Sequence, residues 1–141
     1  MYLTFLQSLV VHLNSKNDNA RFLEKIDLVV RQSIQSEIAQ SVNETFNKEE
    51  QTLLAQLNIQ SKAELISLAN ELEQTPVMKI YTAITPSGNA EKILSELLRE
   101  TTKETFFIEF AERPSLIAGA VIEYKGKIAD FSLKNSIESI K

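Results

Sequence analysis

The spacing of apolar residues changes near residue 75. Before it, apolar positions recur at helical intervals; after it, short alternating segments typical of strands appear between helical ones. All three glycines and all three prolines lie after residue 75. Because these residues are the main local interrupters of helices, their absence from the first half predicts an all-helical segment. We therefore expect a boundary near Thr75–Pro76, with one domain over residues 1–75 and a second over residues 76–141.

Polar residues and apolar spacing divide the first part of the helical half. The consecutive residues Asn17, Asp18 and Asn19 predict a break after a short first helix. A long helix is then predicted over residues 20–46, because its apolar residues recur every four positions. At about 100° per residue such a stripe winds around the helix and suits contact with more than one neighbour. The stripe consists of Ile26, Val30, Ile34, Ile38, Val42 and Phe46.

Two capping patterns predict the remaining helices of this half. Asn47 with Glu50, and Ser61 with Glu64, have the spacing of capping boxes, in which a short polar side chain and a glutamate close the first turn. The helices that follow carry leucines at helical spacing, namely Leu53, Leu54 and Leu57, then Leu65, Leu68 and Leu72. The first half is therefore interpreted as an antiparallel helical bundle or a pair of helical hairpins.

The second half predicts a small α/β domain in the order β-α-β-β-β-α, so the fold class is α+β. The predicted elements are a strand over 77–84, a helix capped by Ser87, a strand over 105–111, strands over 117–124 and 127–131 joined by a Lys125–Gly126 turn, and a helix capped by Ser132. A single sheet with helices on one face is the economical packing. The residues expected to face the core are Met78, Ile80, Ile84, Ile93, Leu94, Leu97, Leu98, Phe106, Ile108, Phe110, Ile117, Val121, Ile128 and Leu133.

Charge and composition exclude several functional classes. Net charge is −4, from 15 basic and 19 acidic residues, which argues against a broad phosphate-binding surface and hence against nucleic acid as a partner. There is no cysteine, which removes disulfides, thiolate metal sites and cysteine nucleophiles. No apolar run is long enough to cross a bilayer, and residues 1–13 lack the basic start of a signal peptide. We expect a cytoplasmic protein without direct membrane insertion.

The sequence offers few candidate catalytic residues. His12 is the single histidine, and its place three residues after Leu9 on a short apolar helix favours a structural or surface role. The acidic pairs Glu49–Glu50 and Glu71/Glu73 have the pattern of solvated helix faces rather than of paired carboxylates in a pocket. No glycine-rich phosphate loop or nucleophile elbow is present. We expect no catalytic residue, no metal site and no cofactor.

Residues 112–137 form the most specific stretch of the chain. Its residues predict a lead-in to a buried strand, a close backbone approach, a tight hairpin and a capped helix. They are Ser115, Leu116, Gly119, Gly126, Asp130 and Ser132. By spacing alone the stretch is a hairpin followed by a capped helix.

That stretch, followed by Lys134 in the last helix, resembles the C-terminal signature of the delta subunit of F-type ATP synthases, the oligomycin-sensitivity-conferring protein family. The segment from Tyr81 to Ser87 is similar to the strand and capped helix of the same family, so the resemblance covers residues 77–141. It implies a non-catalytic stator subunit that links the catalytic head to the b-subunit stalk. Family members have an N-terminal six-helix bundle that grips the alpha-subunit N-termini, whereas this chain has room for about four helices.

Within that interpretation, the C-terminal domain joins the b subunit, and the candidate contact residues are Arg113, Lys134 and Ile137. The surface around the winding stripe of the helical half is the candidate contact with the alpha-subunit N-terminus, and the complex would hold the protein at the inner (plasma) membrane. Three alternatives remain: an E-like stalk subunit of V/A-type ATPases, a free-standing interaction adaptor with a similar domain, and a small enzyme.

Overall fold

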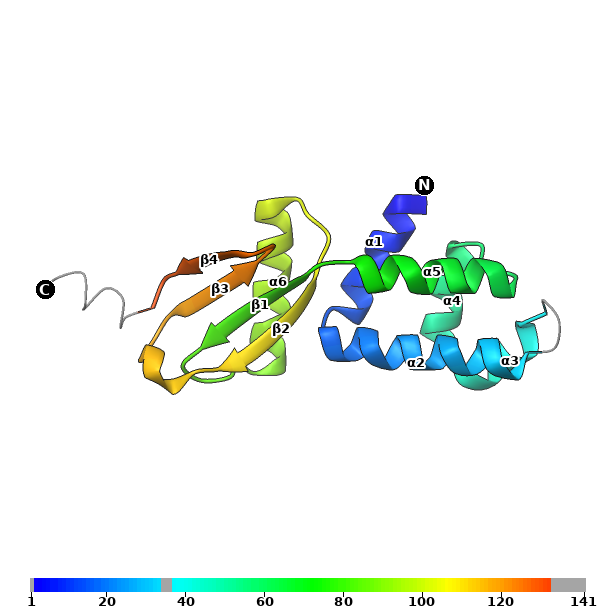
Figure 1. Ribbon diagram of the computed structural model, residues 1–141, viewed down its shortest axis with the longest axis horizontal. Coiled ribbons are helices and arrows are strands. Elements are labelled where there is room, and N and C mark those ends of the chain that lie inside the picture. Colours follow the sequence, from blue (N-terminus) through cyan, green and yellow to red (C-terminus); the bar gives the residue numbers. More distant parts are fainter. Residues whose placement is uncertain (1, 34–36, 133–141) are drawn as a thin grey trace, which may run out of the picture. The chain divides into compact units, whose positions relative to one another are not determined.

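The computed structural model describes residues 2–33 and 37–132 (Figure 1). These residues form an α+β structure with six α-helices, one 3-10 helix and a four-stranded mixed sheet. The chain separates into two compact units, Met1–Leu13 with Asn17–Thr75, and Asn14–Lys16 with Pro76–Lys141. The predicted final helix, with Leu133, Lys134 and Ile137, lies outside the described residues.

The described residues of the helical unit form five helices, where the sequence suggested about four: α1 (Tyr2–Leu13), α2 (Lys16–Gln32), α3 (Ala39–Thr45), α4 (Lys48–Gln56) and α5 (Lys62–Gln74). The predicted break at residues 17–19 is wrong, because α1 ends at Leu13 and α2 already contains Asn19. Asn19 is buried, and its Nδ2 donates to the carbonyl oxygen of Leu72 at 3.5 Å. A side chain that finds a partner on another helix has no need of a local turn.

The single long helix predicted over residues 20–46 is also wrong. Helix α2 ends at Gln32 and α3 begins at Ala39, while Ile38 before α3 and Phe46 after it are both buried. On one straight helix Ile26 and Phe46 would point about 160° apart. Separate helices let both reach the interior, where the rings of Phe46 and Phe22 lie 5.1 Å apart.

Both predicted caps are confirmed. Asn47 and Glu50 form a complete capping box at α4, with Asn47 Oδ1 accepting from Glu50 N and Glu50 Oε1 accepting from Asn47 N. At α5 the oxygen of Ser61 accepts from Glu64 N, and its hydroxyl donates to Glu64 Oε1 at 2.9 Å. The predicted leucines Leu65, Leu68 and Leu72 are fully buried along α5.

The C-terminal unit is a sheet with strand order β2-β1-β3-β4 and helix α6 against one face (Figure 1). Its elements are β1 (Val77–Thr82), α6 (Gly88–Thr102), β2 (Phe107–Glu112), the 3-10 helix η1 (Pro114–Leu116), β3 (Ala120–Tyr124) and β4 (Lys127–Asp130). Strands β1 and β2 are parallel and the other pairs antiparallel. Under α6 lie Met78, Ile80, Phe106 and Ile108, with Leu94, Leu98, Phe110, Ala120, Ile122 and Tyr124 packed around them.

Three of the core residues predicted for the strands are exposed instead, as are Ile93 and Leu97 of helix α6. Ile84 is 79% exposed because β1 ends at Thr82, before the alternation reaches it. Ile117, with φ 70°, is 58% exposed in the turn after η1. Ile128 is 70% exposed because it pairs with Glu123 on the edge strand β4, on the sheet face opposite α6. Val121 of β3, also predicted for the core, is buried.

A short segment from the N-terminal half belongs to the C-terminal unit. The carbonyl oxygen of Asn14 accepts from Ile108 N at 2.8 Å, and Ser15 forms a parallel bridge with Ile108. Lys16 Nζ lies 3.5 Å from Glu109 Oε2. Residues 14–16 thus pair along the outer edge of β2, an edge that would otherwise present unpaired backbone groups.

Arg99 of α6 holds that segment in place. Its guanidinium donates to Asn14 Oδ1 at 2.6 Å, to Asn14 O at 3.3 Å and to Phe106 O at 2.7 Å. Asn14 adopts a left-handed conformation (φ 63°), which asparagine tolerates better than most residues. Partial burial lowers the pKa of Arg99, but arginine remains charged at any physiological pH.

Candidate interaction surfaces

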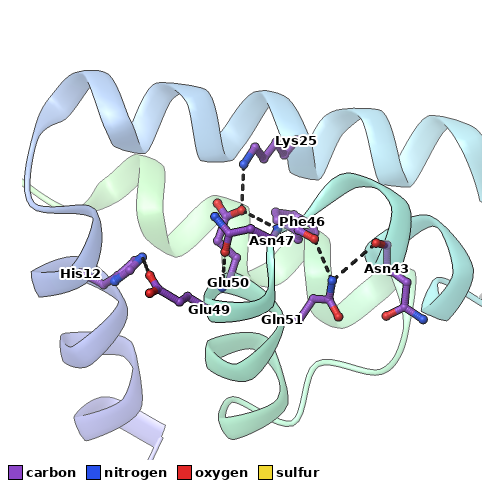
Figure 2. A network of polar contacts seen from close by, with 8 residues as sticks. All are labelled: His12, Lys25, Asn43, Phe46, Asn47, Glu49, Glu50 and Gln51. Atoms are coloured by element: carbon purple, nitrogen blue, oxygen red, sulfur yellow. Dashed lines mark hydrogen bonds and ion pairs between the residues drawn. The ribbon is translucent and has the colours of Figure 1, made fainter.

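The polar network of the helical unit centres on Glu50 (Figure 2). Glu50 is 5% exposed, and its Oε1 accepts from Lys25 Nζ at 2.7 Å and from Asn47 N at 3.0 Å. One carboxylate oxygen therefore pairs with the charge of a lysine on α2 and accepts the hydrogen bond of the backbone N–H at the N-cap of α4. A buried charge that is paired and hydrogen-bonded in this way has a structural role.

The same network extends across the turn between α3 and α4. Gln51 Nε2 donates to Phe46 O at 2.7 Å and to Asn43 O at 3.5 Å (Figure 2). Lys25 Nζ also lies 6.0 Å from the centre of the Phe46 ring. The bonds of Gln51 fix the end of α3 against the start of α4, and the ammonium group of Lys25 lies over an aromatic ring at the same place.

His12 sits at the edge of this network rather than inside a site. Its Nε2 lies 3.8 Å from Glu49 Oε2, and the side chains are 37% and 79% exposed. Such an exposed pair, charged only when the imidazole is protonated, has a small energy. Among residues 2–33 and 37–132, no group of three or more His, Asp or Glu side chains could hold a metal ion.

Among the hollows that open to solvent on the described helical residues, two are lined partly by residues 18–30 of α2. One, of about 250 Å³, is polar and is lined by His12, Leu13, Asp18, Arg21, Phe22, Lys25 and Glu50. The other, of about 190 Å³, runs between α2 and α5 and has an apolar floor with a polar rim. Its lining is Leu23, Ile26, Val30, Ile66 and Ala69, with Asp27, Asn70 and Glu73. The second hollow is a groove between two helices with room for an apolar side chain of a partner.

The predicted glycines of the C-terminal unit have distinct structural roles. Gly119 has φ 81°, and a Cβ there would lie 2.3 Å from Phe131 O, so only glycine fits. Gly126 (φ 78°) follows Lys125 (φ 50°) in the turn between β3 and β4. Two positive φ values define the type I′ hairpin turn, so the predicted Lys125–Gly126 turn is confirmed.

Asp130 and Ser132 of the predicted motif lie close to Gly119, at the end of the β3–β4 hairpin opposite its turn. Asp130 Oδ1 accepts from Ser132 N at 2.9 Å and from Ser132 Oγ at 2.7 Å, and Ser132 is buried. Ser115 and Leu116 lie in η1, where Leu116 is buried and Ser115 is exposed. The motif residues in this part of the chain therefore shape the backbone around the hairpin.

Of the predicted partner contacts, Arg113 lies within the described residues, whereas Lys134 and Ile137 lie outside them. The guanidinium carbon of Arg113 stands 3.9 Å from the centre of the Tyr81 ring, and Arg113 N donates to Thr82 O. Lys79 lies over the same ring at 5.2 Å. Hydrogen bonding to Tyr81, and then the charge of Glu109, raise the pKa of Lys79. Exposed Arg113 thus keeps its charge at the surface while its planar group stacks on an aromatic ring.

Helix α6 has two apolar faces where the sequence predicted one stripe. Leu94 and Leu98 pack onto the sheet, but Ile93 and Leu97 are 53% and 54% exposed. On a helical projection Ile93 and Leu98 are about 140° apart, which is wider than a single buried face. The sequence therefore already contained a signal that these four residues do not all face the sheet. Ser87 stands at the N-cap as predicted, but its side chain makes no capping hydrogen bond.

Comparison with known proteins identifies a family and a curated relative. The family model described as ATP synthase delta (OSCP) subunit matches residues 3–141. A curated relative, "ATP synthase subunit delta" of Thermosipho africanus (strain TCF52B), is 26% identical over 125 residues, which covers 83% of this chain and 66% of the relative. The chain therefore spans slightly less than two thirds of that relative's length.

Proposed function

The chain belongs to the ATP synthase delta (OSCP) subunit family, and on that premise we propose that it is a non-catalytic peripheral-stalk subunit of a rotary F-type ATP synthase. The observation that carries the proposal is a family match that extends over both units rather than over the C-terminal signature alone. The same match favours the delta-type interpretation over an E-like subunit of V/A-type ATPases. In this role the protein would link the catalytic head to the b-subunit stalk and resist the torque of the rotor.

The two units divide this task in the proposal. The C-terminal unit would bind the b subunit, and the helical unit would bind the N-terminal segment of the alpha subunits. The groove between α2 and α5 supports the second contact, because an apolar floor with Asp27 and Glu73 at its rim suits an amphipathic helix. The first 75 residues also contain six basic and ten acidic side chains, so the unit as a whole favours a cationic partner.

The complex would hold the protein at the inner (plasma) membrane. In the part of the chain that the structure describes, no helix is both long and apolar enough to cross a bilayer. Membrane association would thus come from the stalk rather than from a span within these residues.

Calorimetry with two peptides tests the proposal. The full chain would be titrated with a peptide of the C-terminal helix of the cognate b subunit, and separately with an N-terminal peptide of the alpha subunit. Saturable 1:1 binding of the b peptide is expected, and its absence with a folded chain would refute the stalk role. The full chain is needed because residues 14–16 belong to the C-terminal unit, so a fragment that starts at Pro76 lacks the segment that pairs along the outer edge of β2.

A further inference from the structure

Helix α6 has an outer face that contains none of the contact residues predicted from the sequence. This face is defined by Ala90, Ile93, Glu96, Leu97 and Glu100. We propose that this face is the docking surface for an amphipathic helix with an aliphatic seam that ends in Lys or Arg. The inference rests on the proposed function, in which that helix belongs to the stalk. It assigns the stalk contact to α6, whereas the sequence pointed to Arg113 and the C-terminal residues.

The first argument is the spacing of the exposed apolar residues. Ala90, Ile93 and Leu97 fall at successive a, d and a positions of a heptad, the seam by which one helix packs on another. All three are exposed, and Ile93 and Leu97 have more than half of their surface in solvent. Single exposed aliphatic residues are ordinary, but a seam of three on one helix is the pattern of a helix-binding surface.

The second argument is that the seam is independent of the fold. Helix α6 already packs on the sheet through Leu94 and Leu98, with fully buried Ser95 between them. Ser95 Oγ donates to Glu91 O at 2.7 Å, so its hydroxyl is satisfied within the helix. The outer residues therefore add nothing to the core, and a sequence under no other demand would place polar side chains there.

The third argument is charge. Glu100 occupies the next position of the seam and Glu96 flanks Leu97, so the apolar surface ends in two exposed carboxylates one turn apart. Within the described residues neither carboxylate forms a close ion pair, although the charge of Glu96 acts on Arg99 and opposes the lowering of its guanidinium pKa by burial. A helix with cations at the matching positions is favoured. Two copies of α6 would bring four carboxylates to one small interface, which disfavours self-association through this face.

The test uses the full chain and the peptide of the b subunit's C-terminal helix, with binding measured by calorimetry. Ile93→Gln and Leu97→Gln are expected to weaken binding at least about tenfold, as central apolar anchors do. Ile128→Gln is the matched control, because it removes an even more exposed isoleucine of the same unit from β4 and should leave the affinity unchanged. Far-UV circular dichroism checks that each variant is folded.

Charge variants provide an independent measurement. Glu96→Gln and Glu100→Gln are each expected to weaken binding by about 1.5- to 5-fold and to reduce its dependence on salt, because surface ion pairs are small and screened. A double variant would carry both substitutions. If its affinity for the peptide depends on salt concentration as strongly as that of the wild-type chain, Glu96 and Glu100 do not contact the cations of the partner helix.

The remaining outcomes separate this inference from the proposed function. If the wild-type chain binds the peptide and the α6 variants bind equally well, the docking surface lies elsewhere and the stalk role stands. If the folded wild-type chain does not bind, both are refuted.

A dimer of the wild-type chain that Leu97→Gln dissociates would assign the face to a second copy. A shift of the Ile93 and Leu97 methyl resonances on deletion of residues 133–141, without peptide, would assign it to the chain's own C-terminal segment. Either result overturns the inference.

Discussion

Besides the backbone bond from Ile108 N and the Lys16–Glu109 ion pair, the guanidinium of Arg99 attaches residues 14–16 to the sheet, so Arg99→Met should destabilise the protein. The variant keeps an apolar stem of similar length and removes the donors to Phe106 O and to both oxygens of Asn14. Asn14 O keeps its bond from Ile108 N, so two acceptors lose their protein partner. At about 1 kcal/mol for each hydrogen bond, and about 0.5 kcal/mol for the cation over the Phe106 ring, the expected loss is about 2–3 kcal/mol.

A double-mutant cycle isolates the part that concerns Asn14. Asn14→Gly removes the Oδ1 acceptor but keeps the backbone carbonyl and the left-handed conformation, which glycine adopts freely. The free energy of unfolding of the wild type, both single variants and the double variant would be measured by urea titration. A coupling energy of about 1 kcal/mol is expected for the 2.6 Å bond between Arg99 Nη1 and Asn14 Oδ1.

Hydrogen exchange provides a second readout of the same attachment. The amide of Ile108, which donates to Asn14 O, should exchange faster in Arg99→Met, while the amide of Phe107, which donates to Pro76 O, should change less. Arg99→Lys is the matched control, because it keeps the charge without the planar fork and should recover part of the loss. A coupling energy within error of zero, with unchanged exchange at Ile108, would refute the attachment.

Three further predictions concern the glycines, the buried carboxylate and pH. Gly119→Ala should cost about 2–4 kcal/mol, because a Cβ would meet the Phe131 carbonyl, whereas Gly126→Ala should cost about 1 kcal/mol for its positive φ alone, both measured by urea unfolding. Glu50→Ala should cost about 2–3 kcal/mol through the lost cap and the unpaired lysine, measured by thermal unfolding. Lys125, 2.9 Å from Glu104, lowers the pKa of Glu104, so Lys125→Met should raise that pKa in a carbon-13 NMR titration.

Each of these three predictions has its own control or a result that would contradict it. Equal costs for the two glycine variants would contradict the close approach at Gly119. Glu49→Ala, at an exposed neighbour of Glu50, should change stability by less than about 0.5 kcal/mol. For Glu104, a lowered folded-state pKa means that its contribution to stability is present above the carboxyl group's ordinary pKa and is lost as pH falls through the lowered value. An unchanged Glu104 titration in Lys125→Met would contradict this pairing.

The features that were predictable from the sequence are those whose cause is local. The caps at Asn47 and Ser61 each join a side chain to a backbone group three residues away, so the sequence contains both partners. The Lys125–Gly126 turn is equally local, since a two-residue loop needs positive φ values and glycine provides one of them. The family signature was recognisable for the same reason: Gly119, Asp130 and Ser132 act within one hairpin and its exit.

Which side of an element is buried depended instead on neighbours that are distant in the sequence. Asn19 looked like a helix breaker until α5 provided the Leu72 carbonyl, 53 residues away. Asn14 became part of the sheet because Arg99, 85 residues later, binds it. Ile93 and Leu97 follow the same helical spacing as Leu94 and Leu98, and only the position of the sheet determines which pair is covered.

The sequence by itself therefore determined the α+β class, the local caps and turns, and the family to which the chain belongs. The tertiary structure alone decided where the predicted long helix breaks, which strand edge residues 14–16 cover, and which apolar residues remain exposed for a partner. The physical reason is that capping and turn formation act over three or four residues, whereas burial is a property of the surfaces that the folded chain brings together.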